Sequence, residues 1–388
     1  MRHRLLALTS ALAAVIAIAA LAPGPSASPT LLESFVGVAE ASGQGGQTPS
    51  VATTTAGADT WTLPRTPWGD PDLQGIWNNT VSTPLERPSA YAGKAFLTDD
   101  ELAKVTVQRR SSRENRDRRD QAPGTVTDVG RAYNAHWFPV PGDPLRRTSL
   151  IVDPPDGRVP PLKPEALERF AAWSRALGRS GSAALPEGRG EGIEDGTEGG
   201  VDGRGTRADN PEDRRVSERC ITFGLPRLPG GYNNHFRIVQ SPGSVVIEIE
   251  MIHEARIIPL DGGPHLPQEI RQWLGDSRGR WEGETLVVDT TNFTDKAPFR
   301  GSFEGLHLVE RFWRVNADTI NYEVTIDDPT TFTRPWTVAF PITKLESLVG
   351  GVDQVQVPQM FEYACHEGNY GLEGQLRGTR AEEKARLR

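Results

Sequence analysis

The chain has 388 residues, of which 37% are hydrophobic and 24% are charged, and its formal net charge is −8. An acidic chain without a basic stripe is a poor match for nucleic acid, so we expect no nucleic-acid partner. The 40 Gly and 31 Pro residues predict many turns and long loops and argue against a helical bundle. This length fits one large β-rich domain with extensions, or two small domains.

The first 27 residues have the pattern of a secretory signal peptide. Arg2 and Arg4 precede an apolar run over residues 5–22, and a Pro-Gly-Pro break and small residues follow up to Ala27. An uncleaved membrane anchor is the alternative, because the run is near the lower limit for a span. Cleavage after Ala27 removes two arginines and no acid, which takes the charge from −8 to −10. We expect a secreted or periplasmic protein that has no stable membrane anchor after processing.

The two cysteines, Cys220 and Cys365, favour a single disulfide in an oxidising compartment. The alternative is a nucleophilic Cys365 beside His366. Neighbouring residues on an extended chain point to opposite faces, so their adjacency alone does not make a catalytic dyad.

Composition divides the chain before Cys220 into three parts. Residues 28–60 are mostly Ser, Thr, Ala, Gly and Gln and predict a disordered leader. Residues 61–178 predict an N-terminal strap with a short strand at 147–153 and two helices that pack on the rest of the fold. Residues 179–218 are rich in Gly, Arg, Glu and Asp and predict an acidic disordered loop, either a mobile lid or a plain insertion.

Local signals place the two helices of the strap. Thr98 and Glu101 form a capping box, which begins a helix that runs to about residue 119. The many arginines near the end of that helix indicate either a site for an anionic partner or a solvated surface. Pro164 fits the first turn of a second helix over residues 164–177.

From Cys220 onwards the pattern is β, and we expect residues 219–388 to form an antiparallel barrel. Eight short apolar segments are separated by turn residues. The expected strands are 236–240, 245–251, 255–260, 285–291, 307–315, 319–326, 336–342 and 359–363. Residues 276–279 and 282–283 are interpreted as turns, and residues 266–274 as a short helix. The fold class is therefore mainly β, a lipocalin-like or calycin-type barrel with N-terminal helical extensions, and a β-sandwich is the alternative.

Alternation along the strands suggests candidate catalytic residues. Glu310 and Glu323 lie on predicted strands, opposite or beside the apolar face of each strand. They are either solvent-facing charges or acids that point into a polar barrel interior. His253 and His366 could act as general acid or base at the ends of hairpins. Together with His265 they could also ligate a metal, but the spacing matches no compact metal signature, so no cofactor is predicted.

Aromatic, arginine and rim residues are the candidate ligand contacts. The expected ligand-binding residues are Arg256, Trp273, Asp276, Arg278, Trp281, Arg311, Trp313 and Trp336. Asp276 and Arg278 could equally form a salt bridge at the rim of the barrel.

Several longer motifs carry a resemblance. They are DLQGIWNNTVSTPLERP (72–88), SERCITFGLPR (217–227), HEARIIPLDGGPH (253–265), WLGDSRGRWEGETLVVDTTNF (273–293) and FEYACHEGNY (361–370). Together they resemble a family of exported proteins of soil bacteria whose members carry no assigned activity. The resemblance implies export and a barrel-like core. In addition, Gly75-x-Trp77 resembles the opening of lipocalin-like barrels, in which the indole closes the barrel base.

No nucleophile elbow, phosphate-binding loop or dinucleotide-binding fingerprint is present. The leading hypothesis is therefore a barrel that binds a small organic ligand in its interior. The alternatives are a hydrolase or lyase that uses Glu and His as acid and base, possibly assisted by a metal, and a purely structural envelope protein. The sequence does not indicate an oligomeric state.

Overall fold

The computed structural model describes residues 61–117, 144–176, 210–214, 216–230, 233–345, 360–368 and 370–387. The expected signal peptide, the leader at 28–60 and most of the acidic tract at 179–218 lie outside these residues. Among the described helices, none is long and apolar enough to cross a membrane.

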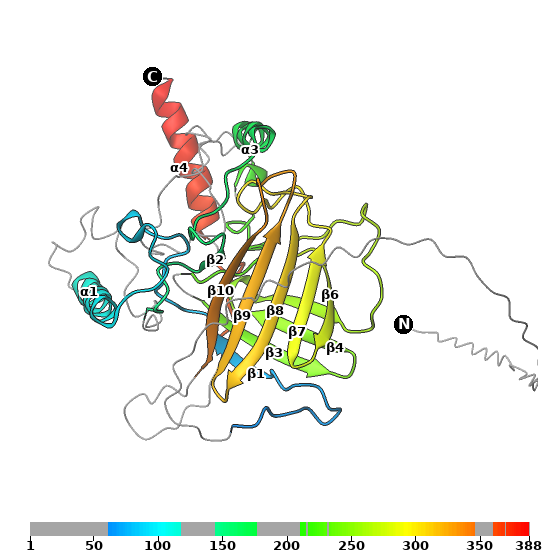
Figure 1. Ribbon diagram of the computed structural model, residues 1–388. Coiled ribbons are helices and arrows are strands. Elements are labelled where there is room, and N and C mark those ends of the chain that lie inside the picture. Colours follow the sequence, from blue (N-terminus) through cyan, green and yellow to red (C-terminus); the bar gives the residue numbers. More distant parts are fainter. Residues whose placement is uncertain are drawn as a thin grey trace, which may run out of the picture. The chain divides into compact units, whose positions relative to one another are not determined.

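The described strands form one antiparallel sheet of ten strands, shown in Figure 1. Nine of them follow the order β5-β4-β3-β1-β10-β9-β8-β7-β6, and β2 pairs with β10 off this path. The strands are β1 (Gly75–Asn78), β2 (Ile151–Asp153), β3 (His235–Ser241), β4 (Ser244–Ile249), β5 (Glu254–Pro259), β6 (Asp276–Glu282), β7 (Thr285–Thr291), β8 (His307–Asn316), β9 (Thr319–Asp327) and β10 (Trp336–Lys344).

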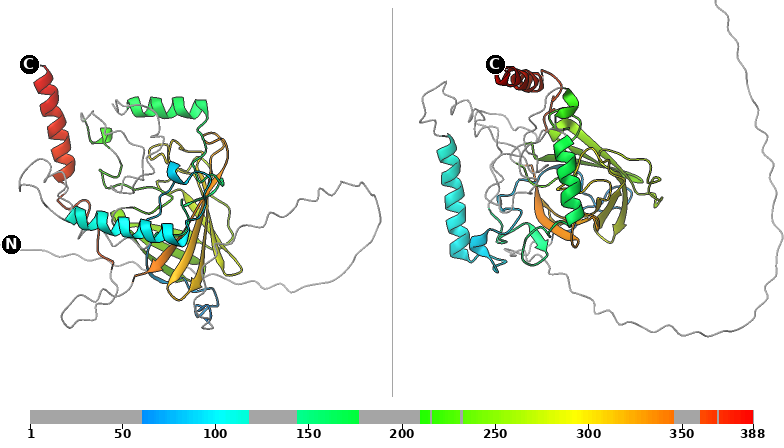
Figure 2. Two further views of the ribbon diagram at one scale, coloured as in Figure 1. Left: turned by 60° about the vertical axis from the view of Figure 1, so that its left-hand side comes forward. Right: turned by 90° about the horizontal axis from the view of Figure 1, so that it is seen from above.

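The sheet closes on itself, because its two terminal strands, β5 and β6, pack against each other. No backbone ladder joins them, and Gly279 of β6 faces Ile258 and Leu260 at this junction, which we call the seam. The view from above in Figure 2 shows the strands surrounding a common interior. The predicted antiparallel, lipocalin-like barrel is confirmed, and the alternative of two packed sheets is not observed. The barrel also takes β1 from the segment that was expected to be a strap.

The two ends of the barrel are closed differently. At the base lie the β3–β4, β6–β7 and β8–β9 hairpins and the segment that precedes β1. Trp77 is fully buried there, its Nε1 donates to the carbonyl of Leu73 at 2.9 Å, and Arg314 lies over its ring at 5.4 Å. The Trp77 indole is therefore a buried part of the barrel base.

At the opposite end, the top, longer connections and a helix cover the interior. Helix α3 (Pro164–Ala176) packs on the β7–β8 connection, where Trp173 contacts Phe303 edge to face. Arg169 donates to the Thr331 hydroxyl in the β9–β10 connection at 3.0 Å. The predicted second helix is confirmed, and its role is to cover this end of the barrel.

The predicted first helix is also confirmed, as α1 (Asp99–Asp117). Its capping box forms as expected: Thr98 N donates to Glu101 at 2.8 Å, and Glu101 N donates to the Thr98 hydroxyl at 3.3 Å. Most of the arginine-rich continuation of this helix falls on residues whose side chains are not described. Helix α4 (Tyr370–Arg386) was not predicted.

Seven of the eight strands predicted from Cys220 onwards are confirmed within two residues at each end, and the short strand predicted at 147–153 is observed only over its last three residues, as β2. The described part of the eighth, residues 360–363, pairs with no strand, since a disulfide and not a sheet edge holds that segment. Two further predictions were wrong. Residues 276–279, interpreted as turns, open β6, and the segment at 266–274, predicted to be helical, has no helix. In β6, charged side chains point outward and small ones lie against β5, a pattern that looks like a turn when the neighbouring strand is unknown.

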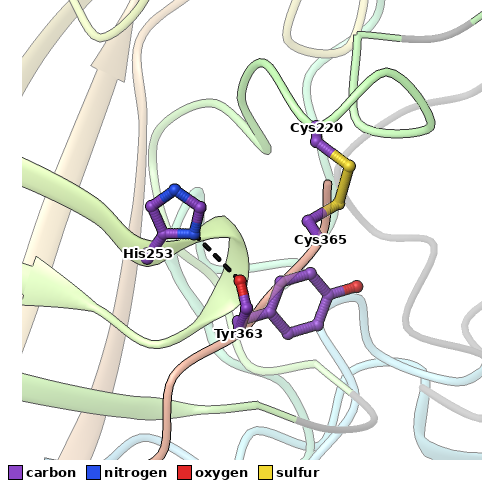
Figure 3. The surroundings of a disulfide bond; sticks show 4 residues. All are labelled: Cys220, His253, Tyr363 and Cys365. Carbon is purple, nitrogen blue, oxygen red and sulfur yellow. Dashed lines mark hydrogen bonds between the residues drawn. A yellow bond between two sulfur atoms is a disulfide. The ribbon is translucent and has the colours of Figure 1, made fainter. Parts of the chain in front are cut away.

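The Cys220–Cys365 disulfide is formed, with the two Cα atoms 5.7 Å apart. It joins the segment before β3 to the segment before α4, as Figure 3 shows. His253 lies beside this bond, and its Nδ1 is 2.9 Å from the carbonyl oxygen of Tyr363. The disulfide excludes the alternative of a nucleophilic Cys365, since the thiol is consumed.

Candidate functional site: the barrel interior

A pocket lies in the barrel interior, and the empty space between its lining side chains, part of which is open to solvent, is about 370 Å³. Alternation along the strands brings aliphatic and aromatic side chains to this interior, with a few polar groups among them. Its lining residues are Arg227, Phe236, Ile238, Ile247, Ile249, Arg256, Glu310, Phe312, Tyr322, Phe340 and Ile342. Because this value includes space open to solvent, the enclosed space is far smaller than the roughly 300–1,000 Å³ of small-molecule sites, and a ligand would have to displace lining side chains to enter.

A buried ion pair occupies one wall of the pocket. Arg256 of β5 donates to both carboxylate oxygens of Glu310 on β8, at 3.1 and 2.6 Å. The Tyr322 hydroxyl donates to the same carboxylate at 2.9 Å. Arg256 also donates to the hydroxyls of Ser277 and Thr290, at 3.1 and 3.2 Å. The two charges therefore neutralise each other inside the barrel, and of the described Arg256 nitrogens only Nε is buried without a partner.

Burial and contact with Glu310 shift the pKa values of Arg256 and Tyr322. Burial alone would lower the pKa of Arg256, but the charge and hydrogen bonds of Glu310 outweigh it, so the pKa is raised. Burial, together with the adjacent Glu310 carboxylate, raises the pKa of Tyr322 well above its ordinary value. Glu310 is thus held as the counter-ion of a permanent cation. That arrangement suits a fixed wall of a binding site better than a general acid or base.

A second arginine of the pocket has no such partner. Arg227 is 8% exposed, and its guanidinium lies 4.5 Å from the centre of the Phe223 ring. No hydrogen bond or ion pair of its side chain exists within the described residues, and its Nε is buried without a partner. Burial lowers the pKa of Arg227 to about 10, against an opposing attraction from Glu254, so the group remains a cation at neutral pH.

The Glu254 carboxyl is held by other groups. Its Oε1 accepts from the Thr222 hydroxyl and from Phe223 N, the latter at 3.1 Å, while Oε2 is buried without a partner. Burial raises the pKa of Glu254, and its hydrogen bonds and the nearby arginines oppose that rise. Glu254 is thus the near carboxylate that attracts Arg227, but it does not pair with it.

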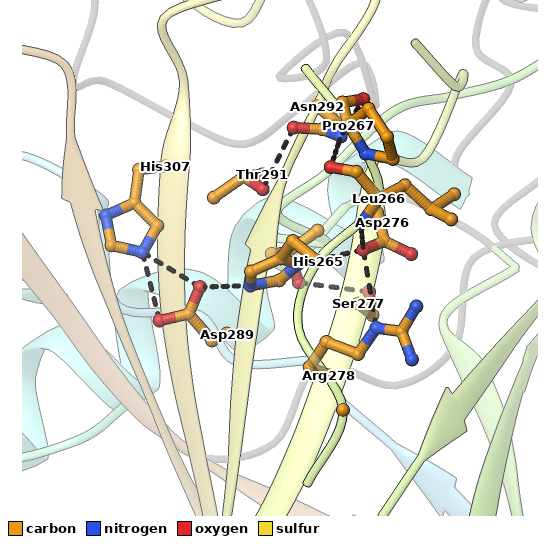
Figure 4. Close-up of polar contacts among 12 residues, drawn as sticks. His265, Leu266, Pro267, Asp276, Ser277, Arg278, Asp289, Thr291, Asn292 and His307 are labelled. Atoms are coloured by element: carbon orange, nitrogen blue, oxygen red, sulfur yellow. Dashed lines mark hydrogen bonds and ion pairs between the residues drawn. The ribbon is translucent and has the colours of Figure 1, made fainter. Parts of the chain in front are cut away.

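On the outer wall of the barrel, histidines and aspartates alternate in a chain across β6, β7 and β8, which we call the outer chain (Figure 4). His265 lies 2.9 Å from Asp276 through Nδ1 and 3.0 Å from Asp289 through Nε2. His307 Nε2 lies 3.1 Å from both oxygens of Asp289. Arg278 completes the outer chain with a 3.4 Å contact to Asp276.

The outer chain is an electrostatic network. The hydrogen bond with Asp289 raises the pKa of His307, and the same contact lowers the pKa of Asp289. Burial would raise the pKa of Asp276, but hydrogen bonds from the Leu266 amide, His265 and Arg278 outweigh it, and the pKa is lowered. Among the described residues no Ser, Thr or Cys is hydrogen-bonded to either imidazole, so the outer chain contains no activated nucleophile.

The structure does not bring the four candidate catalytic residues together. Glu310 lies in the interior, whereas Glu323 of β9 is on the outer face, where burial raises its pKa. His253 is in the β4–β5 turn and exposed, and His366 is exposed in the segment before α4. Within the described part of the chain, no group of three or more His, Cys, Asp or Glu residues is arranged to hold a metal ion.

The candidate ligand-binding residues separate into interior and exterior groups. Arg256 lines the pocket, and Trp336 is fully buried at the top of the interior against Phe332 and Phe299. Trp281, close to the β6–β7 hairpin at the base, packs against the core.

The others lie outside the pocket. Trp273 is 37% exposed, Asp276 and Arg278 belong to the outer chain, and Arg311 forms a 2.7 Å ion pair with Glu282 on the outer wall. Trp313 alternates with buried Phe312 and so faces outward.

Arg227 and Tyr322 are pocket residues that the sequence analysis did not select. Tyr322 alternates with Glu323 along β9 and belongs to the buried, apolar face of this strand. Arg227 is in an irregular segment seven positions after Cys220, so no periodicity identifies it. The available signal was its place at the end of the SERCITFGLPR motif, which contains the disulfide-bonded Cys220.

No known family profile matches the chain, and no curated protein is significantly similar to it. The class of protein is therefore defined by its architecture, a lipocalin-like antiparallel barrel with an apolar interior pocket.

Proposed function

We propose that this protein is an exported barrel that binds a small organic ligand in its interior. The observation that carries the proposal is the interior pocket, whose apolar side chains surround a few fixed polar groups. That combination is typical of small-molecule sites, in which apolar contacts provide affinity and a few polar groups fix orientation.

Two observations support export. The N-terminal sequence has the charged, apolar and small-residue regions of a signal peptide. The chain also carries a disulfide, which persists in oxidising compartments. Secretion or a periplasmic location is therefore part of the proposal.

The first testable prediction is that neutral apolar molecules bind among the interior isoleucines. Ile238, Ile247, Ile249 and Ile342 line the pocket, whereas Ile257 and Ile270 are 70% and 49% exposed. Protein labelled at the isoleucine methyl groups is titrated with neutral ligands of increasing size, from benzyl alcohol to naphthalene-2-carboxamide. We expect saturable NMR shifts at the pocket methyls and little change at the exposed ones.

A matched pair of variants tests the location. Ile247→Phe adds volume inside the pocket and should weaken binding severalfold, while Ile257→Phe adds the same volume outside the neighbouring strand and should not. Shifts confined to the exposed methyls, or none with any ligand of the series, would overturn interior binding.

A further inference from the structure

The structure assigns Arg227 as the anchor for the acidic group of the ligand: we infer that the pocket binds a small organic anion, an apolar body that carries one carboxylate. This inference rests on the proposed function and specifies the class of ligand. It depends on the charges inside the barrel and on how each of them is satisfied.

The charged side chains of the pocket do not balance one another. Three charged side chains line it, Arg227, Arg256 and Glu310. The bidentate contact between Arg256 and Glu310 cancels two of them. Arg227 remains as a cation without a counter-ion in contact, and a carboxylate would supply the missing charge.

Burial without a partner makes the Arg227 guanidinium unfavourable in the unliganded protein. A guanidinium has five N–H donors and cannot lose its charge near neutral pH. Buried charges in proteins are normally paired, since desolvation without compensation is unfavourable. In the described structure this group is more than nine-tenths buried, lines a cavity, and makes no hydrogen bond. An anionic ligand would remove this penalty on binding.

The Arg227 side chain is also preorganised. The guanidinium stacks on Phe223, which leaves the N–H groups in its plane free for a planar, two-oxygen partner. The backbone of Arg227 is fixed as well, because its carbonyl accepts from buried Asn79 at 3.3 Å. The loop continues to Gly230, whose amide and carbonyl both bond to the Asn234 side chain, at 3.0 and 2.7 Å.

The remaining pocket residues define the rest of the ligand. Apart from the Arg256–Glu310–Tyr322 wall, all of them are Ile or Phe. A second charge on the ligand would therefore be desolvated without a partner. A monocarboxylate with an aliphatic or aromatic body matches this lining, whereas a di-acid or a sugar does not.

The test compares two probes of nearly equal shape, naphthalene-2-carboxylate and naphthalene-2-carboxamide, on the full-length protein. We expect the carboxylate to bind at least about tenfold more tightly at neutral pH, since hydrogen bonds to a charged group are stronger than neutral ones. Arg227→Met keeps the stem over Phe223 and should abolish this preference while leaving the carboxamide affinity within about twofold. Arg227→Lys, which keeps the charge, should retain part of the preference.

Arg237→Met is the control, because Arg237 lies on the outer face of β3 and pairs with Glu248 there at 3.4 Å. It should leave both affinities unchanged. Arg227→Met should melt at or above the wild-type temperature, since it removes an unpaired buried charge. Equal affinity for the two probes, or a preference that survives in Arg227→Met, would overturn the anion anchor and leave interior binding intact. Failure of both probes to bind would contradict interior binding itself.

Discussion

Arg256 and Glu310 form an ion pair in the barrel interior, and their side chains are 4% and 2% exposed. Two ions removed from water lose several kcal/mol of hydration each, and their attraction repays this only when the geometry is good. Here the contact is bidentate, and a tyrosine and two hydroxyl groups surround it. The pair should therefore depend strongly on both members being present.

We predict that removing one member of the pair destabilises the protein more than replacing both members with apolar residues. Glu310→Gln leaves the Arg256 charge buried and should lower the free energy of unfolding by about 3–5 kcal/mol. The triple variant Arg256→Met, Glu310→Leu, Tyr322→Phe removes both charges of the pair and the tyrosine hydroxyl. Its free energy of unfolding should lie within about 2 kcal/mol of the wild-type value. Urea denaturation measures both.

Glu248→Gln provides the comparison for that experiment, because Glu248 pairs with Arg237 on the exposed face. Its effect should stay below about 1 kcal/mol. A triple variant as unstable as Glu310→Gln would show that the ion pair is a net source of stability.

The placement of these residues in the barrel interior could be predicted from the sequence only in part. Alternation places Glu310 on the same face of β8 as Leu308 and Phe312, but it does not say which face of a strand is interior. Arg256 and Glu310 are 54 positions apart, and their contact depends on how the sheet closes. The position of Arg227 in the pocket could not be predicted, because Arg227 lies in an irregular segment, where no alternation of residues shows which way a side chain points.

At the scale of elements, sequence patterns were reliable where one face of a strand is plainly apolar. β7 was predicted at its observed bounds for this reason, with Leu286 and Val288 inward and Asp289 outward. β6 was missed, because its inward positions include Ser277 and Gly279, which read as turn residues. Small side chains are needed there because β5 lies close by, a fact that the local sequence does not contain.

The disulfide is the element that joins the C-terminal segment to the barrel top. Cys220 and Cys365 are separated by 145 positions, and the chain-entropy model gives roughly 3–5 kcal/mol for a loop of that length. We predict that the double variant Cys220→Ser, Cys365→Ser lowers the free energy of unfolding by about this amount in urea.

The same variant should also loosen the pocket. Cys220 begins the segment that positions Arg227, so the carboxylate preference should fall more than the carboxamide affinity. The wild-type protein treated with dithiothreitol serves as a matched control and should behave like the double variant. Unchanged stability in both would show that the sheet alone holds this end of the barrel.

At the scale of the whole barrel, closure depends on a single junction without backbone hydrogen bonds. Eight antiparallel pairings separate β5 from β6 along the sheet, so the two strands run in the same direction where they meet. Sixteen residues connect Pro259 to Asp276, and β5 and β6 meet through side chains. The seam is therefore the part of the barrel that depends most on packing, and it should open before the β8–β9–β10 region.

Gly279 tests that reasoning directly. A Cβ at this position would lie 2.5 Å from Leu260 Cδ2 and 2.8 Å from Ile258 Cγ2, so Gly279→Ala requires these side chains, or the two strands, to shift. Overpacking of this kind lowers the free energy of unfolding by about 1–3 kcal/mol.

Gly374→Ala is the control, since Gly374 lies in α4 with nothing within 4 Å of the added carbon, and a helical Gly to Ala change is neutral or stabilising. Hydrogen exchange should show faster opening of β5 and β6 amides in Gly279→Ala and unchanged protection in β9. An even loss of protection across all strands would mean that the barrel opens as one unit and that the seam is not its weakest line. In that case the β5–β6 packing would be as strong as the hydrogen-bonded ladders, and closure would not depend on Gly279.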